Sequence, residues 1–86
     1  MSNGKRLYQD VLNKLLVLID SGEYPVGGRL PPERELAERF GVSRPTIREA
    51  IIALEALERV SVKTGSGVYV LEHYSLSDHV YQTITP

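Results

Sequence analysis

Apolar residues recur every three or four positions in three separate segments of this chain, the spacing that places side chains on one face of a helix. The pattern predicts helices over residues 6–21, 32–40 and 44–58. The apolar positions that define them are Leu7, Val11, Leu15, Leu18 and Ile19, then Leu36, Ala37 and Phe40, then Ile47, Ala50, Ile51, Leu54 and Leu57. A chain of 86 residues with three such helices has room for one small core.

The ends of the second and third predicted helices carry recognisable signals. Pro32 suits the first turn of a helix, where its missing N–H costs nothing, and Glu33 follows it where the helix dipole favours negative charge. Gly41 is a natural left-handed stop, and Ser43 is a good N-cap for the helix that follows. Only Gly41 and Val42 separate the two helices, which indicates a helix-turn-helix.

The last patterned stretch predicts a β-hairpin. Residues 60–62 and 68–70 alternate apolar and polar side chains, and the glycine-rich stretch 64–67 lies between them. The predicted fold class is therefore mainly α with a small β wing, a winged helix-turn-helix of three helices plus a β-hairpin over residues 1–71. Residues 72–86 lose the pattern and are expected to form a linker or tail.

The composition argues against several classes of function. The chain has no cysteine, and the spacing of His73 and His79 suits no standard metal motif, so we expect neither a metal nor a cofactor. No pair of carboxylates and no Ser/His/Asp set stands out, which argues against an enzyme. No apolar run suits a membrane span or a signal peptide, so we expect a cytoplasmic protein without a membrane partner.

Positive charge is concentrated where the helix-turn-helix is predicted. The net charge of the chain is only −1, yet residues 29–48 hold five arginines against three glutamates. A modest basic patch on a nearly neutral domain suits a protein that binds specific DNA sequences better than one that coats nucleic acid.

The opening turns of the third predicted helix carry the main candidate residues, Ser43, Arg44, Pro45, Thr46 and Arg48. In a helix-turn-helix the second helix enters the major groove by its N-terminal end. Arg44 and Arg48 project from nearly the same face, and an arginine can donate two hydrogen bonds to guanine O6 and N7. Ser43 and Thr46 can bond phosphate, while Pro45 stiffens the first turn and could touch a thymine methyl group.

Each of these candidates has a structural alternative. Arg44 and Arg48 could instead form ion pairs with Glu49 or with the acids of the helix over residues 32–40. The prediction of DNA contact fails if both guanidinium groups are turned inward, or are locked to acidic neighbours with nothing basic lining that surface. Arg34 lies where helix-turn-helix proteins approach the DNA backbone, and its alternative is an ion pair within the domain.

The predicted hairpin turn supplies a second set of candidates, Lys63, Thr64 and Gly65. Glycines at positions 65 and 67 would let the backbone approach a phosphate or a minor groove closely. The alternative is a tight turn that needs glycine for its own geometry.

Three linked motifs resemble those of the GntR family of bacterial regulators. They are Gly28-Arg-Leu-Pro-Pro-Glu-Arg-Glu-Leu-Ala, Gly41-Val-Ser-Arg-Pro-Thr-Ile-Arg-Glu-Ala and Gly65-Ser-Gly-Val-Tyr-Val. The resemblance covers about residues 7–71 and looks closest to FadR-type members, including regulators of hexuronate use. It implies that Arg34, Arg44, Thr46 and Arg48 contact the operator, with Ser43 on phosphate and Gly65 of the wing in the minor groove.

The resemblance has departures and implications beyond this chain. Glu58 and Arg59 stand where the family usually has glycine and then a bulky apolar residue, and Thr64 replaces a second basic residue common at the wing tip. Family members carry a larger C-terminal domain that binds a small metabolite and forms the dimer. Because the sequence stops at Pro86, we expect a fragment that lacks this domain.

The predicted function is a sequence-specific transcription regulator, expected to be a metabolite-responsive repressor. Its expected partners are double-stranded, palindromic operator DNA, a second copy of the full-length protein in a homodimer, and a small-molecule effector only at the missing C-terminal domain. The alternative is a winged helix that binds another protein through an apolar face. Ile52 and Ala56 are the exposed apolar candidates on the third helix, and they could equally face a dimer partner.

Overall fold

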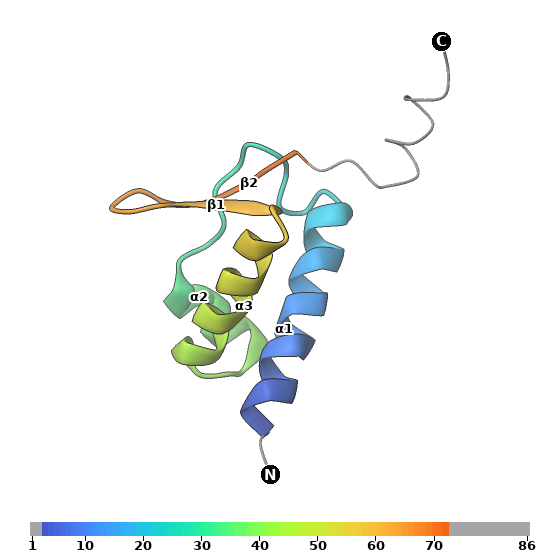
Figure 1. Ribbon diagram of the computed structural model, residues 1–86, viewed down its shortest axis with the longest axis vertical. Coiled ribbons are helices and arrows are strands. Elements are labelled where there is room, and N and C mark those ends of the chain that lie inside the picture. Colours follow the sequence, from blue (N-terminus) through green and yellow to red (C-terminus); the bar gives the residue numbers. More distant parts are fainter. Residues whose placement is uncertain (1–2, 73–86) are drawn as a thin grey trace.

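Three helices and a β-hairpin make up the computed structural model, which describes residues 3–72. The elements are α1 (Asn3–Asp20), α2 (Glu33–Phe40), α3 (Arg44–Ala56), β1 (Val60–Lys63) and β2 (Gly67–Val70). α1 and α3 lie side by side, α2 packs against α3, and the hairpin projects beyond the end of α3 (Figure 1). The predicted class of three helices plus a β wing is confirmed, and we call residues 60–70 the wing.

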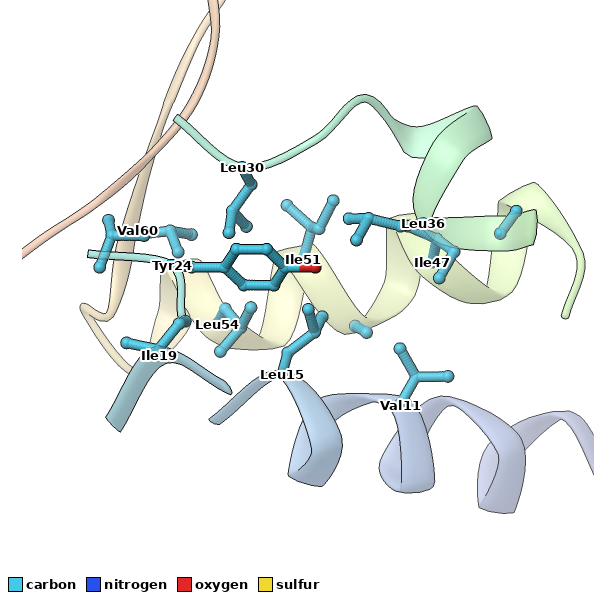
Figure 2. Packing of buried hydrophobic residues seen from close by; sticks show 13 residues of the cluster. Val11, Leu15, Ile19, Tyr24, Leu30, Leu36, Ile47, Ile51, Leu54 and Val60 are labelled. Atoms are coloured by element: carbon cyan, nitrogen blue, oxygen red, sulfur yellow. The ribbon is translucent and has the colours of Figure 1, made fainter. Parts of the chain in front are cut away.

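The core lies where α1, α2 and α3 meet the base of the wing. Leu15, Leu36 and Ile47 are fully buried, and in the view of Figure 2 the ring of Tyr24 lies between Leu30 and Leu15. The buried apolar set is Val11, Leu15, Ile19, Tyr24, Leu30, Leu36, Ala37, Ile47, Ala50, Ile51, Leu54, Val60 and Val70. Burial of these side chains, worth about 1.5–3 kcal/mol for each large one, fixes the three helices relative to one another.

The turn between α2 and α3 has the geometry that its residues predict. Gly41 takes a left-handed φ of 67°, and the N–H of Val42 donates to the Ala37 carbonyl at 3.1 Å. Ser43 then caps α3, because its hydroxyl accepts from the Thr46 N–H. Pro32 differs from the prediction: its ψ of 156° is extended, so it precedes α2 and does not form its first turn.

The ends of α1 and α3 also differ from the predicted bounds. α1 begins at Asn3 rather than residue 6 and ends at Asp20, because apolar spacing marks only the part of a helix that is buried. α3 ends at Ala56 rather than near Glu58, which takes a left-handed φ of 60°. The Arg59 N–H donates to the Leu54 carbonyl, and the Glu58 N–H to that of Glu55, both at 2.9 Å. These bonds form a Schellman motif in which a glutamate occupies the usual glycine position.

The wing is held at its base by α1 and along one side by the loop between α1 and α2. Arg59 is 8% exposed and bonds the Asp20 carboxylate at the end of α1, so a buried arginine fills the position where family members usually have an apolar side chain. The strands pair Val60 with Val70 at one end and Lys63 with Gly67 at the other. Each strand is therefore one residue longer than predicted, at the end nearest the turn.

No helix among residues 3–72 is both long and apolar enough to cross a membrane. His73, His79 and all of the predicted tail except Glu72 lie outside the described residues.

Candidate nucleic-acid interface

The opening turns of α3 present Arg44 and Arg48 to solvent. Their side chains are 61% and 60% exposed, while Ile47 between them is fully buried against the core. One helical turn separates the two arginines, so both guanidinium groups lie on the same outward face. Neither guanidinium group is therefore turned into the interior.

Both arginines nevertheless bond one carboxylate, that of Glu33 at the start of α2. Arg44 Nε lies 3.2 Å from Oε1 of Glu33, and Arg48 donates through Nε to Oε2 and through Nη2 to Oε1, both at 3.0 Å. The alternative of an ion pair with an acid of α2 thus occurs as well, with Glu33 and not with Glu49. A guanidinium has five N–H donors, so both Nη groups of Arg44 and the Nη1 group of Arg48 remain available.

In the cluster of Glu33, Arg44 and Arg48, the opposite charges favour the ionised form of Glu33 and of Arg48. The hydrogen bonds from Arg48 lower the pKa of Glu33, those from Arg44 add to the effect, and partial burial of the carboxylate opposes it. The same hydrogen bond from Arg48 to Glu33 raises the pKa of Arg48. Two cations share one anion here, so the cluster keeps one net positive charge at neutral pH.

Ser43, Pro45 and Thr46 complete the exposed end of α3. The hydroxyl groups of Ser43 and Thr46 are 3.0 Å apart and bond each other, and Ser43 Oγ also accepts from the Thr46 N–H at 3.4 Å. The pair holds two hydroxyl hydrogens and uses one between them, so one is left to donate to an anion such as phosphate. Pro45 is exposed in the first turn of α3 and adds no N–H of its own.

Arg34 and Arg39, both on α2, have different environments. Within residues 3–72 Arg34 forms no ion pair, so its expected alternative of an intradomain pair is not observed there. Arg39 contacts Glu23 at 2.7 Å and donates to the Tyr24 hydroxyl at 2.7 Å, which ties it to the loop that follows α1. Arg34 is therefore the freer cation of the two.

The wing tip places Lys63, Thr64 and Gly65 in solvent. Gly65 has a φ of 81°, and the Ser66 N–H donates to the Lys63 carbonyl at 2.9 Å, which fits a type II turn. The turn's own geometry thus requires glycine at position 65, as its structural alternative proposed, and the same residue leaves the tip narrow.

A groove runs between α3 and the wing, and we call it the wing groove. Its lining includes Arg48 and Ile52 of α3, Lys63 and Ser66 of the wing, and Arg29 of the loop before α2. The groove thereby brings one α3 candidate, Arg48, together with the wing candidates Lys63, Thr64 and Gly65. The candidates that lie outside its lining are Arg34, Ser43, Arg44, Pro45 and Thr46.

The sequence did not specify the contacts that three residues make at this surface: Glu33, Arg29 and Gly67. Glu33 was one of several acids of α2 that could pair with Arg44 and Arg48, and which of them does so depends on how α2 crosses α3. Gly67 was predicted to let the backbone approach DNA closely or to serve the turn, and no local pattern indicates that Arg29 lies against it. Among the described residues no group of three acidic, histidine or cysteine side chains could hold a metal ion.

Comparisons with known proteins agree with this geometry. The family model described as "Bacterial regulatory proteins, gntR family" matches residues 7–70. The Uxu operon regulator of Haemophilus influenzae is 44% identical over 85% of this chain. The Exu regulon transcriptional regulator of Escherichia coli is 45% identical over 80% of it. The chain spans 30% and 27% of the length of these two relatives, which are named as regulators and not as enzymes.

A solved relative carries DNA on the same fold. The structure of AraR(DBD) in complex with operator ORR3 superposes with a TM-score of 0.71 and 34% identity, covering 74% of this chain and 77% of that one. The fold is thus that of a winged-helix DNA-binding domain, and the resemblance found in the three sequence motifs is confirmed. The chain belongs to the GntR family of bacterial regulatory proteins.

Proposed function

We propose that this chain binds operator DNA as the sequence-specific domain of a transcription regulator. The observation that carries the proposal is the pair of exposed guanidinium groups, Arg44 and Arg48, at the N-terminal end of α3. In helix-turn-helix proteins this end enters the major groove, where an arginine that bonds guanine O6 and N7 discriminates by roughly 1–3 kcal/mol. The structure of AraR(DBD) in complex with operator ORR3 supports operator binding by this fold.

The remaining candidates take supporting roles in this complex. Ser43, Thr46 and Arg34 contact phosphates, and Pro45 lies against a base edge at the start of α3. Lys63, Thr64 and Gly65 carry the wing into the adjacent minor groove. Phosphate contacts set the register of the protein on the duplex, and the α3 arginines supply the sequence preference.

The biological role follows from the relatives. The Uxu and Exu regulators among them agree with the resemblance to regulators of hexuronate use, so an operator of such an operon is the first candidate. We propose a repressor that binds a palindromic operator in the cytoplasm as a dimer and leaves it when a metabolite binds a C-terminal domain. Residues 72–86 would be the linker to that domain.

Selection of bound sites from random double-stranded DNA with the purified chain tests the proposal directly. We expect a recurring half-site, and enrichment of no sequence would contradict sequence-specific binding. Arg44→Ala and Arg48→Ala should each lower the preference for the selected site by roughly 5- to 150-fold, the equivalent of 1–3 kcal/mol. Far-UV circular dichroism should show that both variants keep their helices. Full preference retained by both variants would overturn the assignment of α3.

The alternative of a protein-interaction module also has a specific observation. Ile52 and Leu57 are 59% and 51% exposed near the C-terminal half of α3, and Ala56 is exposed beside them. A salt titration separates the two functions. DNA binding through phosphates weakens steeply as salt rises, whereas binding through an apolar face does not.

A further inference from the structure

The backbone at Arg29 is attached to the wing. The Leu30 N–H donates to the Val68 carbonyl at 2.7 Å, and the Val70 N–H donates to the Gly28 carbonyl at 2.9 Å. Arg29 itself pairs with Tyr69 as an isolated antiparallel bridge. Leu30 is buried in the core, so the neighbouring Arg29 side chain, which lines the wing groove, extends from a fixed backbone.

The Arg29 side chain lies directly on the backbone of Gly67. A Cβ atom placed on Gly67 would come within 2.6 Å of Arg29 Nε and 3.1 Å of Arg29 Cδ. Real Cβ atoms do not approach other atoms so closely, so any other residue at position 67 would displace the arginine. Gly67 also has a φ of 145°, which L residues rarely adopt.

Arg29 forms no ion pair within the described residues. Arg39, Arg44, Arg48 and Arg59 each form an ion pair with a described residue. The wing groove also holds Lys63 and two carboxylates, of which Glu33 already bonds Arg44 and Arg48, and Glu55 forms no ion pair with Arg29. An exposed guanidinium held on a fixed backbone without a protein anion is suited to an external one.

The position of the wing groove identifies that anion. When a helix occupies the major groove and a hairpin the neighbouring minor groove, the sugar–phosphate strand that separates the two grooves passes between helix and hairpin. We propose that Arg29 binds a phosphate of this strand and that Gly67 is glycine so that the Arg29 side chain can reach it. The proposal deepens the proposed function and rests on it.

Arg29→Gln in the whole chain, measured against the selected duplex and a scrambled duplex over a range of salt concentrations, tests the assignment. One lost phosphate contact should lower the slope of log affinity against log salt by about one. Affinity should fall by a similar factor for both duplexes, because a phosphate carries no base identity. Lys14→Gln is the matched control, since it removes one positive charge on α1 outside the wing groove. An unchanged slope, or a loss confined to the selected duplex, would overturn the proposal.

Gly67→Ala tests the second half of the proposal, in wild-type and Arg29→Ala backgrounds. With Arg29 present, the added methyl group should displace its side chain and weaken DNA binding about as much as Arg29→Ala does. With Arg29 already truncated there is no guanidinium group to displace, so Gly67→Ala should cost less affinity than it does in the wild-type background. Any cost of hairpin strain is common to both backgrounds and cancels in the difference between them. Equal losses in the two backgrounds would show that Gly67 does not act through Arg29.

Failure of the inference differs from failure of the proposed function. A wild-type chain that binds no duplex overturns both. A wild-type chain that binds the selected site, beside an Arg29→Gln variant with the same salt slope, overturns only the role of Arg29.

Discussion

Glu33 contacts the two arginines that the proposed function places on base edges. It has two opposing effects on DNA binding. Its carboxylate orients both guanidinium groups, with donor–acceptor distances of 3.0–3.2 Å. It also removes one unit of positive charge from a surface that would approach phosphates. Orientation favours sequence preference, while the lost charge lowers affinity for DNA of any sequence.

Glu33→Gln should therefore raise affinity for scrambled duplex by a few-fold and lower the preference for the selected site by roughly 5- to 20-fold. The measurement is a pair of fluorescence titrations with selected and scrambled DNA. Glu49→Gln is the matched control, because it removes the same charge from exposed α3 without touching Arg44 or Arg48. It should raise both affinities and leave the preference intact. A Glu33→Gln variant with unchanged preference would contradict the orienting role.

The same carboxylate gives the fold a pH dependence of definite sign. Arg48 lowers the pKa of Glu33 below its ordinary value of 4.5, so the folded state binds the proton less readily than the unfolded chain. The stabilisation is complete above that value and is lost as pH falls through the lowered pKa. In urea unfolding, the stability advantage of wild type over Glu33→Gln should be constant from pH 8 to pH 6 and should shrink as pH falls below 4.5. An advantage that does not diminish as pH falls below 4.5 would refute this.

At the scale of the elements, the end of α3 explains a departure from the family pattern. Glu58 takes the left-handed position at which helices usually have glycine. A non-glycine residue there costs roughly 1–2 kcal/mol, which the bonds from Glu58 and Arg59 to carbonyls of α3 and the burial of Arg59 must offset.

Glu58→Gly should therefore stabilise the domain by about 0.5–1 kcal/mol, after the greater freedom of glycine in the unfolded chain is subtracted. The midpoint of urea unfolding measures the change. Glu55→Gly, three residues earlier and inside the helix, is the control and should lower the free energy of unfolding by about 1 kcal/mol. A lower midpoint for Glu58→Gly would mean that the glutamate side chain makes a stabilising contact.

How much could be predicted from the sequence differs from element to element. The helices and the hairpin follow from local spacing, and Gly41 and Ser43 end and begin helices through conformations that their own chemistry favours. The end of α3 was misplaced because Glu58 has no intrinsic preference for a left-handed φ. Of the candidate site, the α3 face was predictable because helical periodicity alone separates Ile47 from Arg44 and Arg48. The contacts of Glu33 and Arg29 were not, because they join segments whose proximity is set only by packing.

At the scale of the whole molecule, the contact between Arg59 and Asp20 joins the base of the wing to the end of α1. The Arg59 side chain is 10% exposed, and its Nε atom is buried without a hydrogen-bond partner within the described residues. Asp20 is 65% exposed and lies at the C-terminal end of α1, where the helix dipole disfavours an anion.

Asp20→Ala tests which of these two effects on the stability of the domain is larger, because they have opposite signs. Relief of the dipole alone would stabilise the domain by a few tenths of a kcal/mol, whereas loss of the partner of a buried guanidinium should destabilise it by about 1–3 kcal/mol. We expect the second effect to dominate in thermal unfolding. In an Arg59→Leu background the same substitution should be neutral or slightly stabilising. Destabilisation by equal amounts in both backgrounds would exclude the ion pair as its cause.

The attachment of residues 27–30 to β2 also has a mechanical consequence. A hairpin of two strands is only marginally stable by itself, but here an extra edge and the buried side chains of Leu30, Val60 and Val70 brace it against the helices. The distance between the N-terminal end of α3 and the tip of the wing is then fixed in the free protein, before DNA binds. In the proposed complex the protein would therefore lose little conformational freedom on binding. The distance between its two DNA contacts would stay fixed, so any bending that the fit requires would occur in the double helix.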